Sequence, residues 1–152
     1  MKNKILPFII SVLLISSLNA QDLILTAVYD GPLSGGTPKG VELYVISDIT
    51  DLSKYALGSA NNGGGTDGAE YTLSGSASAG DYLYFSSEST QFTSFFGFAP
   101  TATSGAMSIS GDDAIELFFD ADDGNGMVVI DVFGDIRVDG TGEAWHYEDG
   151  GA

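Results

Sequence analysis

The densest group of side chains that could bind a metal lies in residues 120–126, which read Asp-Ala-Asp-Asp-Gly-Asn-Gly. Calcium prefers several oxygen ligands from alternating Asp and Asn positions, and glycine permits the tight turn between them. The segment therefore predicts a calcium site whose ligands are Asp120, Asp122, Asp123 and Asn125. An EF-hand loop beginning at Asp120 would put Gly124 at a ligand position and Asp131 where the last glutamate belongs. The alternative is an acidic hairpin loop, and the incomplete ligand set favours that alternative.

Catalytic side chains are scarce. The chain has no cysteine and one histidine, His146, which stands between Trp145 and Tyr147. No G-x-S-x-G motif marks a serine nucleophile, so a half-exposed strand histidine is the favoured interpretation. Acid–base pairs work across a cleft between separate segments, whereas adjacent residues point apart, as in Asp112-Asp113, Asp122-Asp123 and Glu148-Asp149. We therefore expect a solvated acidic rim, no catalytic residue and no required cofactor.

Residues 63–68 read Gly-Gly-Gly-Thr-Asp-Gly and match the pattern G-x-G-x-x-G. A dinucleotide site requires a helix that starts within this motif, so that the helix N-terminus meets the pyrophosphate. Here residues 69–73, Ala-Glu-Tyr-Thr-Leu, follow and have the composition of a strand. We therefore expect a flexible, low-complexity loop over Gly58–Gly68 and no nucleotide site.

Composition excludes further classes of chemistry. The chain has 152 residues with 21 Asp+Glu and 5 Lys+Arg, a formal net charge of −16. The absence of cysteine excludes disulfides, thiolate metal sites and iron–sulfur clusters. A single histidine excludes metal sites that need two or three imidazoles. The charge argues against nucleic-acid binding, which requires clustered Lys and Arg on phosphates.

The first 20 residues have the order of a secretory signal peptide. Lys2 and Lys4 precede the mostly apolar run Ile5–Ile15, and a polar stretch ends at Ala20. A membrane anchor is the weaker alternative, because a spanning helix needs about 20 apolar residues. Cleavage would leave residues 21–152 as one domain with a charge of −18, since all 21 acids follow Ala20 and only three bases do. We expect a secreted or periplasmic protein with no membrane segment after cleavage.

Six short segments have the composition of strands, and three of them (41–46, 114–119 and 128–133) alternate with a period of two; Leu23–Val28 is apolar on both faces. The six segments are Leu23–Val28, Val41–Ile46, Tyr71–Leu73, Asp81–Phe85, Ala114–Phe119 and Val128–Phe133. Turn-forming residues separate them, among them Asp30-Gly31-Pro32 and Asp123-Gly124. The pattern predicts an all-β fold, a sandwich or barrel.

One short helix interrupts the strands. Phe92, Phe95 and Phe96 have the spacing of one helical face, with Ser89 as the expected N-cap and Gly97 as the expected end. Clustered aromatic rings are usually buried, so we expect these rings to plug one end of the sandwich. The alternative is an exposed aromatic platform for a ligand.

From Leu23 onward the sequence resembles a bacterial lamin tail domain, of the type found at the front of large secreted nucleases. The resemblance depends on an ordered series of short segments: 39–44 (KGVELY), 51–57 (DLSKYAL), 79–81 (AGD), 111–117 (GDDAIEL), 130–136 (IDVFGDI), 139–142 (DGTG), Trp145 and Tyr147. It implies an immunoglobulin-like β-sandwich and a non-catalytic module joined to a nuclease, phosphoesterase or other hydrolase. Family members continue past Glu148-Asp149-Gly150 with an aromatic closing strand, so whether 21–152 is a truncated module stays open.

These observations lead to one expected function and two alternatives. We expect an exported module that binds, tethers or positions, with a surface or protein partner or a covalently linked hydrolase domain, and without direct nucleic-acid binding. The first alternative is the N-terminal fragment of an extracellular nuclease. The second is a calcium-stabilised carbohydrate-binding module, which would need coplanar exposed aromatic rings on one sheet face.

Overall fold

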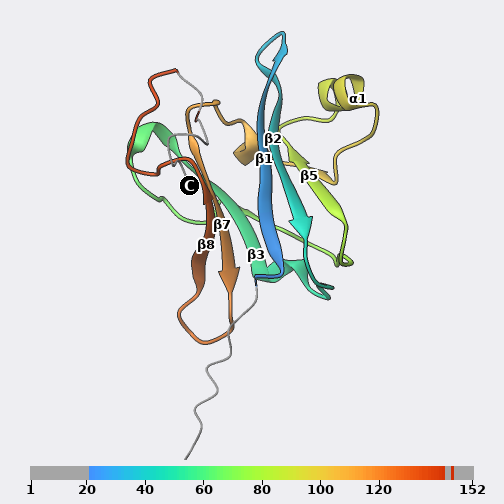
Figure 1. Cartoon of the computed structure of the whole chain (residues 1–152), viewed down its shortest axis with the longest axis vertical. Helices are drawn as coiled ribbons and strands as arrows, with labels where there is room; N and C mark the ends of the chain where they lie inside the picture. Colours follow the sequence, from blue (N-terminus) through green and yellow to red (C-terminus); the bar gives the residue numbers. More distant parts are fainter. Residues whose placement is uncertain (1–20, 143–144, 146–152) are drawn as a thin grey trace, which may run out of the picture.

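The computed structural model describes residues 21–142 and 145, and it consists of two four-stranded sheets that pack against each other (Figure 1). The first sheet has the order β1 (Leu23–Leu33), β2 (Thr37–Val45), β5 (Tyr82–Ser86), β6 (Ala102–Thr103). The second has the order β4 (Tyr71–Thr72), β3 (Tyr55–Ala60), β7 (Ala114–Asp120), β8 (Met127–Phe133). All neighbours are antiparallel except β5 and β6. The predicted all-β character and two-sheet sandwich architecture are confirmed.

The core lies between the two sheets. Val41, Leu43 and Val45 of β2 are fully buried there, as the period-two pattern predicts. Ile115 and Leu117 of β7 face them from the second sheet. Apolar burial on this scale is the main term that holds a sandwich together.

The sequence pattern missed β3 and the two-residue strand β6. All six residues of β3 are buried, so no polar face exists to give a period of two. β1 was recognised but runs farther than predicted, because Asp30, Gly31 and Pro32 belong to the strand and the turn follows at residues 34–36. Proline is tolerated there since β1 lies at the edge of its sheet.

Residues 61–70, which we call the glycine strap, lie over β3 on the outer face of the second sheet. The strap begins with the 3₁₀ turn η2 (Asn61–Gly63), and two backbone hydrogen bonds fix it, from Gly65 N to Ile136 O (2.7 Å) and from Glu70 N to Leu57 O (2.9 Å). Gly58 of β3 lies directly below, so close that a Cβ there would clash with the Gly68 carbonyl oxygen. The expected flexible loop is therefore packed against the sheet, and its last residues lead into β4, not into a helix.

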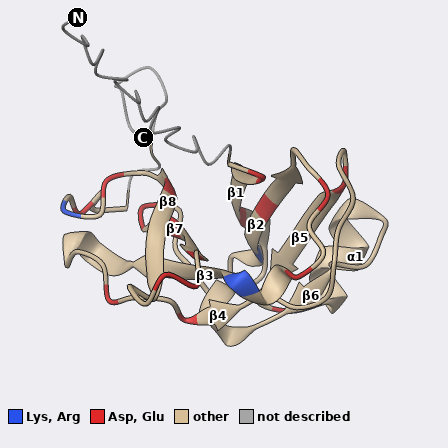
Figure 2. Ribbon diagram, turned by 90° about the horizontal axis from the view of Figure 1, so that it is seen from below, with Lys and Arg blue, Asp and Glu red and all other residues tan. Residues whose placement is uncertain are grey.

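The predicted helix is present as α1 (Thr90–Phe96) and ends at Gly97. Ser89 occupies the N-cap position without a side-chain bond, and the Glu88 carboxylate instead accepts the N–H groups of Gln91 (2.7 Å) and Phe92 (3.0 Å). α1 lies on the side of the first sheet that faces away from the second (Figures 1 and 2). The remaining short helices are the 3₁₀ turns η1 (Leu52–Lys54) and η3 (Gly105–Met107). Within the described part of the chain, none of the helices has the length and apolar character to cross a membrane.

The close approach of the strap to β3 makes Gly58 the position most sensitive to an added methyl group. We expect Gly58→Ala to lower the free energy of unfolding by about 1–3 kcal/mol, because the new Cβ must push away a backbone carbonyl and the Phe118 ring. Gly105→Ala is the matched control, since its Cβ meets nothing within 4 Å, and should change stability by about 0.5 kcal/mol or less. Denaturant unfolding measures both. Equal midpoints for the two variants would contradict this packing of the strap.

Candidate functional site

The four predicted calcium ligands lie at the turn between β7 and β8, Asp120 as the last residue of β7 and the other three in the loop, and all four are half-buried or exposed. Their carboxylate oxygens mainly accept hydrogen bonds from residues of the same turn. Asp120 accepts the N–H of Asp122 (2.8 Å), and Asp123 accepts the backbone and side-chain nitrogens of Asn125 (3.0 and 2.9 Å). The Asp122 carboxylate pairs with Lys54. These contacts are those of an acidic hairpin turn.

No metal centre is assembled elsewhere in residues 21–142 and 145, where no three His, Asp or Glu side chains are arranged to hold an ion. The hydrogen bonds from the Asn125 backbone and side chain hold the pKa of Asp123 below its usual value. The calcium assignment therefore stays a prediction, and the loop geometry favours the hairpin interpretation.

The acidic pair Asp112-Asp113 does not form a solvated rim. Asp113 is buried, and its carboxylate accepts N–H groups from Ser110 (2.9 Å) and Asn62 (3.2 Å). Asp112 accepts the N–H of Gly142 (2.6 Å). The expectation was therefore wrong for Asp113, which is buried, whereas Asp112 is half-buried. Along the described chain, acidic residues far outnumber basic ones (Figure 2).

Other predictions fall on residues outside the described part of the chain. These are the signal peptide at 1–20, His146, Tyr147 and the pair Glu148-Asp149. Trp145 is described and lies outside any strand.

The aromatic residues of α1 form a second apolar cluster on the outer face of the first sheet. Phe92 is fully buried and contacts Tyr29 and Tyr84 from the sheet, with ring centroids 5.9 and 6.0 Å apart. Phe96 and Phe98 complete the cluster at 4.7 and 5.4 Å from Phe92. Burial raises the pKa of the Tyr29 hydroxyl, which donates to the Phe85 carbonyl at 2.9 Å.

The expectation that the three phenylalanines plug an end of the sandwich was wrong. Only Phe92 is buried, while Phe95 and Phe96 are 50% and 36% exposed. The seven-residue helix α1 lies on a sheet face, where Phe96 still contacts Tyr29 (ring centroids 5.5 Å apart) although its ring stays partly exposed.

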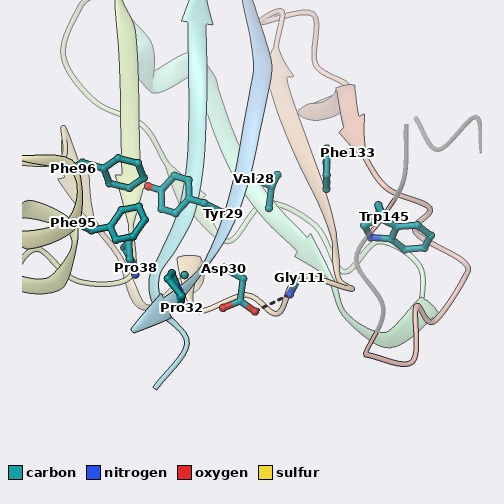
Figure 3. A pocket seen from close by; sticks show the side chains of 11 residues that line it. Val28, Tyr29, Asp30, Pro32, Pro38, Phe95, Phe96, Gly111, Phe133 and Trp145 are labelled. Atoms are coloured by element: carbon teal, nitrogen blue, oxygen red, sulfur yellow. Dashed lines mark hydrogen bonds between the residues drawn. The ribbon is translucent and has the colours of Figure 1, made fainter. Parts of the chain in front are cut away.

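Phe95 and Phe96 form one wall of a cavity of about 400 Å³, which we call the aromatic groove. Figure 3 shows these two rings with Tyr29 at one end, Phe133 and Trp145 at the other, and Asp30 between them. Its full lining is Val28, Tyr29, Asp30, Gly31, Pro32, Pro38, Phe95, Phe96, Gly111, Phe133 and Trp145. The groove thus crosses β1, the edge strand of the first sheet.

The far wall depends on one tryptophan. The Trp145 indole packs on Gly134, where any Cβ would clash with the ring, and its N–H donates to the Asp113 carbonyl at 3.2 Å. A side chain at position 134 would therefore push the indole out of the wall.

The floor of the groove is polar and internally neutralised. Asp30 forms an ion pair with Lys39 (2.7 Å) and accepts the N–H of Gly111 (3.1 Å), as the dashed line in Figure 3 marks. Lys39 also donates to the Ile109 carbonyl (2.7 Å). Because the one acid in the lining is already paired, the groove presents mainly apolar surface to a ligand.

The groove had little local signal in the sequence. Its residues come from β1, the start of β2, α1, the loop before β7 that contains Gly111, β8 and Trp145. The Phe spacing predicted the helix, but not that two rings would stay exposed. These rings provide no flat platform, since Phe95 and Phe96 are inclined by 80° and no ring pair in the described region is closer to coplanar than 41°.

Comparisons with protein-family models, with curated proteins and with solved structures found no match to this chain. The geometry of the groove is therefore the basis for the functional proposal.

The hairpin geometry predicts that millimolar calcium leaves the melting temperature unchanged, because the loop oxygens already accept hydrogen bonds or pair with Lys54. A ligand bound only by the folded state would raise it by mass action. Thermal unfolding with calcium and with excess chelator measures this. A calcium-dependent rise that Asp122→Asn abolishes would instead establish the site.

Proposed function

We propose that this chain is an exported, non-catalytic module of the lamin tail type, with an immunoglobulin-like topology, that binds a protein partner and tethers or positions an associated hydrolase. The proposal is supported by the signal-peptide order of residues 1–20 and by the ordered motif segments between Lys39 and Trp145. The two-sheet architecture agrees with the fold that this resemblance implies.

The aromatic groove is the observation that carries the binding role. Its walls are aromatic and proline side chains, and its one carboxylate is neutralised by Lys39. Exposed aromatic rings around an open cavity are typical of surfaces that bind a partner. The groove also crosses an edge strand, which can pair with an extended peptide through its backbone while neighbouring pockets receive alternate side chains.

The partner that fits these features best is an extended peptide segment rich in proline or aromatic residues. Nucleic acid is disfavoured because residues 21–152 contain three basic and 21 acidic side chains, so the protein would repel phosphate groups. A glycan would stack on flat, exposed rings, and the inclined pair Phe95–Phe96 offers no such surface.

Trp145 provides a direct test, because it is the only tryptophan of the chain and it lines the groove. The experiment follows tryptophan fluorescence of the full chain while short proline- and aromatic-rich peptides are added. We expect a saturable change with these peptides and none with a short oligosaccharide or duplex DNA. Phe95→Ala should weaken peptide binding about fivefold or more, as the loss of a central aromatic contact does.

Tyr82→Ala is the matched control, since Tyr82 is 53% exposed on the same sheet but packs against Tyr44 and lies outside the groove lining. Its peptide affinity should equal that of the unaltered chain. Equal affinities for Phe95→Ala and the unaltered chain would contradict the groove as the binding site. A response to oligosaccharide alone would favour the carbohydrate-binding alternative, and DNA cleavage by the chain would favour the nuclease alternative.

A further inference from the structure

Glu116 lies at the centre of β7 with no accessible surface, on the outer face of the second sheet. Its neighbours Ile115 and Leu117 point into the core, so the Glu116 side chain points the other way, toward the glycine strap. Gly58 of β3 is its partner across the sheet, and Val132 of β8 is its partner on the other side. The strap closes over this position with its Gly68 carbonyl against Gly58.

Among the described residues, neither Oε1 nor Oε2 of Glu116 has a hydrogen-bond partner. A buried carboxylate normally needs a base, several donors or a metal, because its charge is otherwise too costly to take out of water. The charged groups that face it are Asp67 and Glu70 of the strap, both acidic, while β3 and β8 present Gly58 and Val132. Repulsion from these two acids adds to the cost of a charge on Glu116.

A cation is not held at this position by the described residues, since no three acidic side chains come together. Glu70 is in addition engaged, because its carboxylate accepts the N–H and the hydroxyl of Ser59 at 2.8 and 3.0 Å. The simplest way to neutralise Glu116 is therefore a proton.

The strap that covers Glu116 is thin. Each of its ten residues is half-buried or exposed, and none contributes a buried side chain to the core. It is fixed by a small set of hydrogen bonds. Two join backbone groups, Gly65 N to Ile136 O and Glu70 N to Leu57 O, and the Asp113 and Glu70 carboxylates add bonds to Asn62 and Ser59. Segments with little buried apolar surface open at low cost in free energy, so a change of charge beneath the strap is enough to shift its equilibrium.

We propose that Glu116 is a proton-dependent latch: the glycine strap stays closed over β3 and β7 while the Glu116 carboxyl group carries a proton, and it opens when the proton is lost. Opening hydrates the carboxylate and uncovers Phe118 and the outer face of β3. The latch is independent of the aromatic groove, which lies across β1.

The direction of the pH effect follows from the surroundings. Burial is the largest effect and raises the pKa of Glu116 in the closed form. The nearby Thr66 hydroxyl lowers this pKa in part, and the charges of Asp67 and Glu70 raise it again by smaller amounts. In the open form the pKa returns to its ordinary value near 4.5. Between these two values the closed form binds the proton and the open form does not. The equilibrium constant for opening of the strap should therefore increase about tenfold per pH unit in this window. It should level off above the pKa of the closed form.

Amide hydrogen exchange of the full chain tests the latch. The amides of Gly65 and Glu70 report on the strap, and those of β2 report on global unfolding. Protection factors, which correct for the intrinsic pH dependence of exchange, are compared from about pH 4 to about pH 9, the range of glutamate pKa values in proteins. We expect strap protection to fall about tenfold per unit within the window while β2 protection stays constant.

Glu116→Gln should remove this pH dependence, because the amide cannot ionise. Glu42→Gln, the same change on β2, is the matched control and should behave as the unaltered chain. Asp67→Asn retains the latch but weakens the repulsion, so its protection should level off at a lower pH; this variant decides the question even where Glu116→Gln fails to fold. Strap protection that does not change with pH, or that changes equally in Glu116→Gln, would overturn the proposal. Closure that requires an added divalent cation would overturn it in favour of a cation site.

Discussion

The burial of the Glu116 carboxyl group is the constraint on which the arrangement of the second sheet depends. A carboxyl group on the outer face of a central strand would ordinarily face water, and here a ten-residue segment covers it. The cover must approach the sheet closely, which explains the glycine at position 58 and the glycine-rich composition of the strap above it. The glycine-rich composition, which in a sequence suggests a loose linker, here allows the strap to pack closely against the sheet.

The first sheet is covered in a different way. Its outer face carries Tyr29 and Tyr84, and the short helix α1 places Phe92 between them. This cover is apolar and extends beyond the sheet, so Phe95 and Phe96 remain exposed at its margin. The two outer faces therefore have different properties: one bears a fixed aromatic cluster beside an open groove, and the other bears a thin strap over an ionisable group.

This two-sided covering also explains how far the sequence predicts the structure. β2 followed its period-two pattern because one of its faces is fully buried and the other is not. β3 did not, because the strap buries its second face as well, and no alternation was left to detect. The helix was evident from the Phe spacing, but its place on a sheet face depended on Tyr29 and Tyr84, which are distant in sequence. The groove and the buried Glu116 likewise arise from contacts between distant segments, which local patterns do not contain.

The proposed latch requires that the buried Glu116 carboxyl group carries a proton, and a pH titration of its side-chain carboxyl carbon by NMR measures that protonation state directly in the full chain. We expect a midpoint clearly above the ordinary glutamate value of 4.5, accompanied by exposure of the Glu70 amide as the proton is lost. A midpoint at or below the ordinary value, with the strap still closed, would contradict the proposed latch.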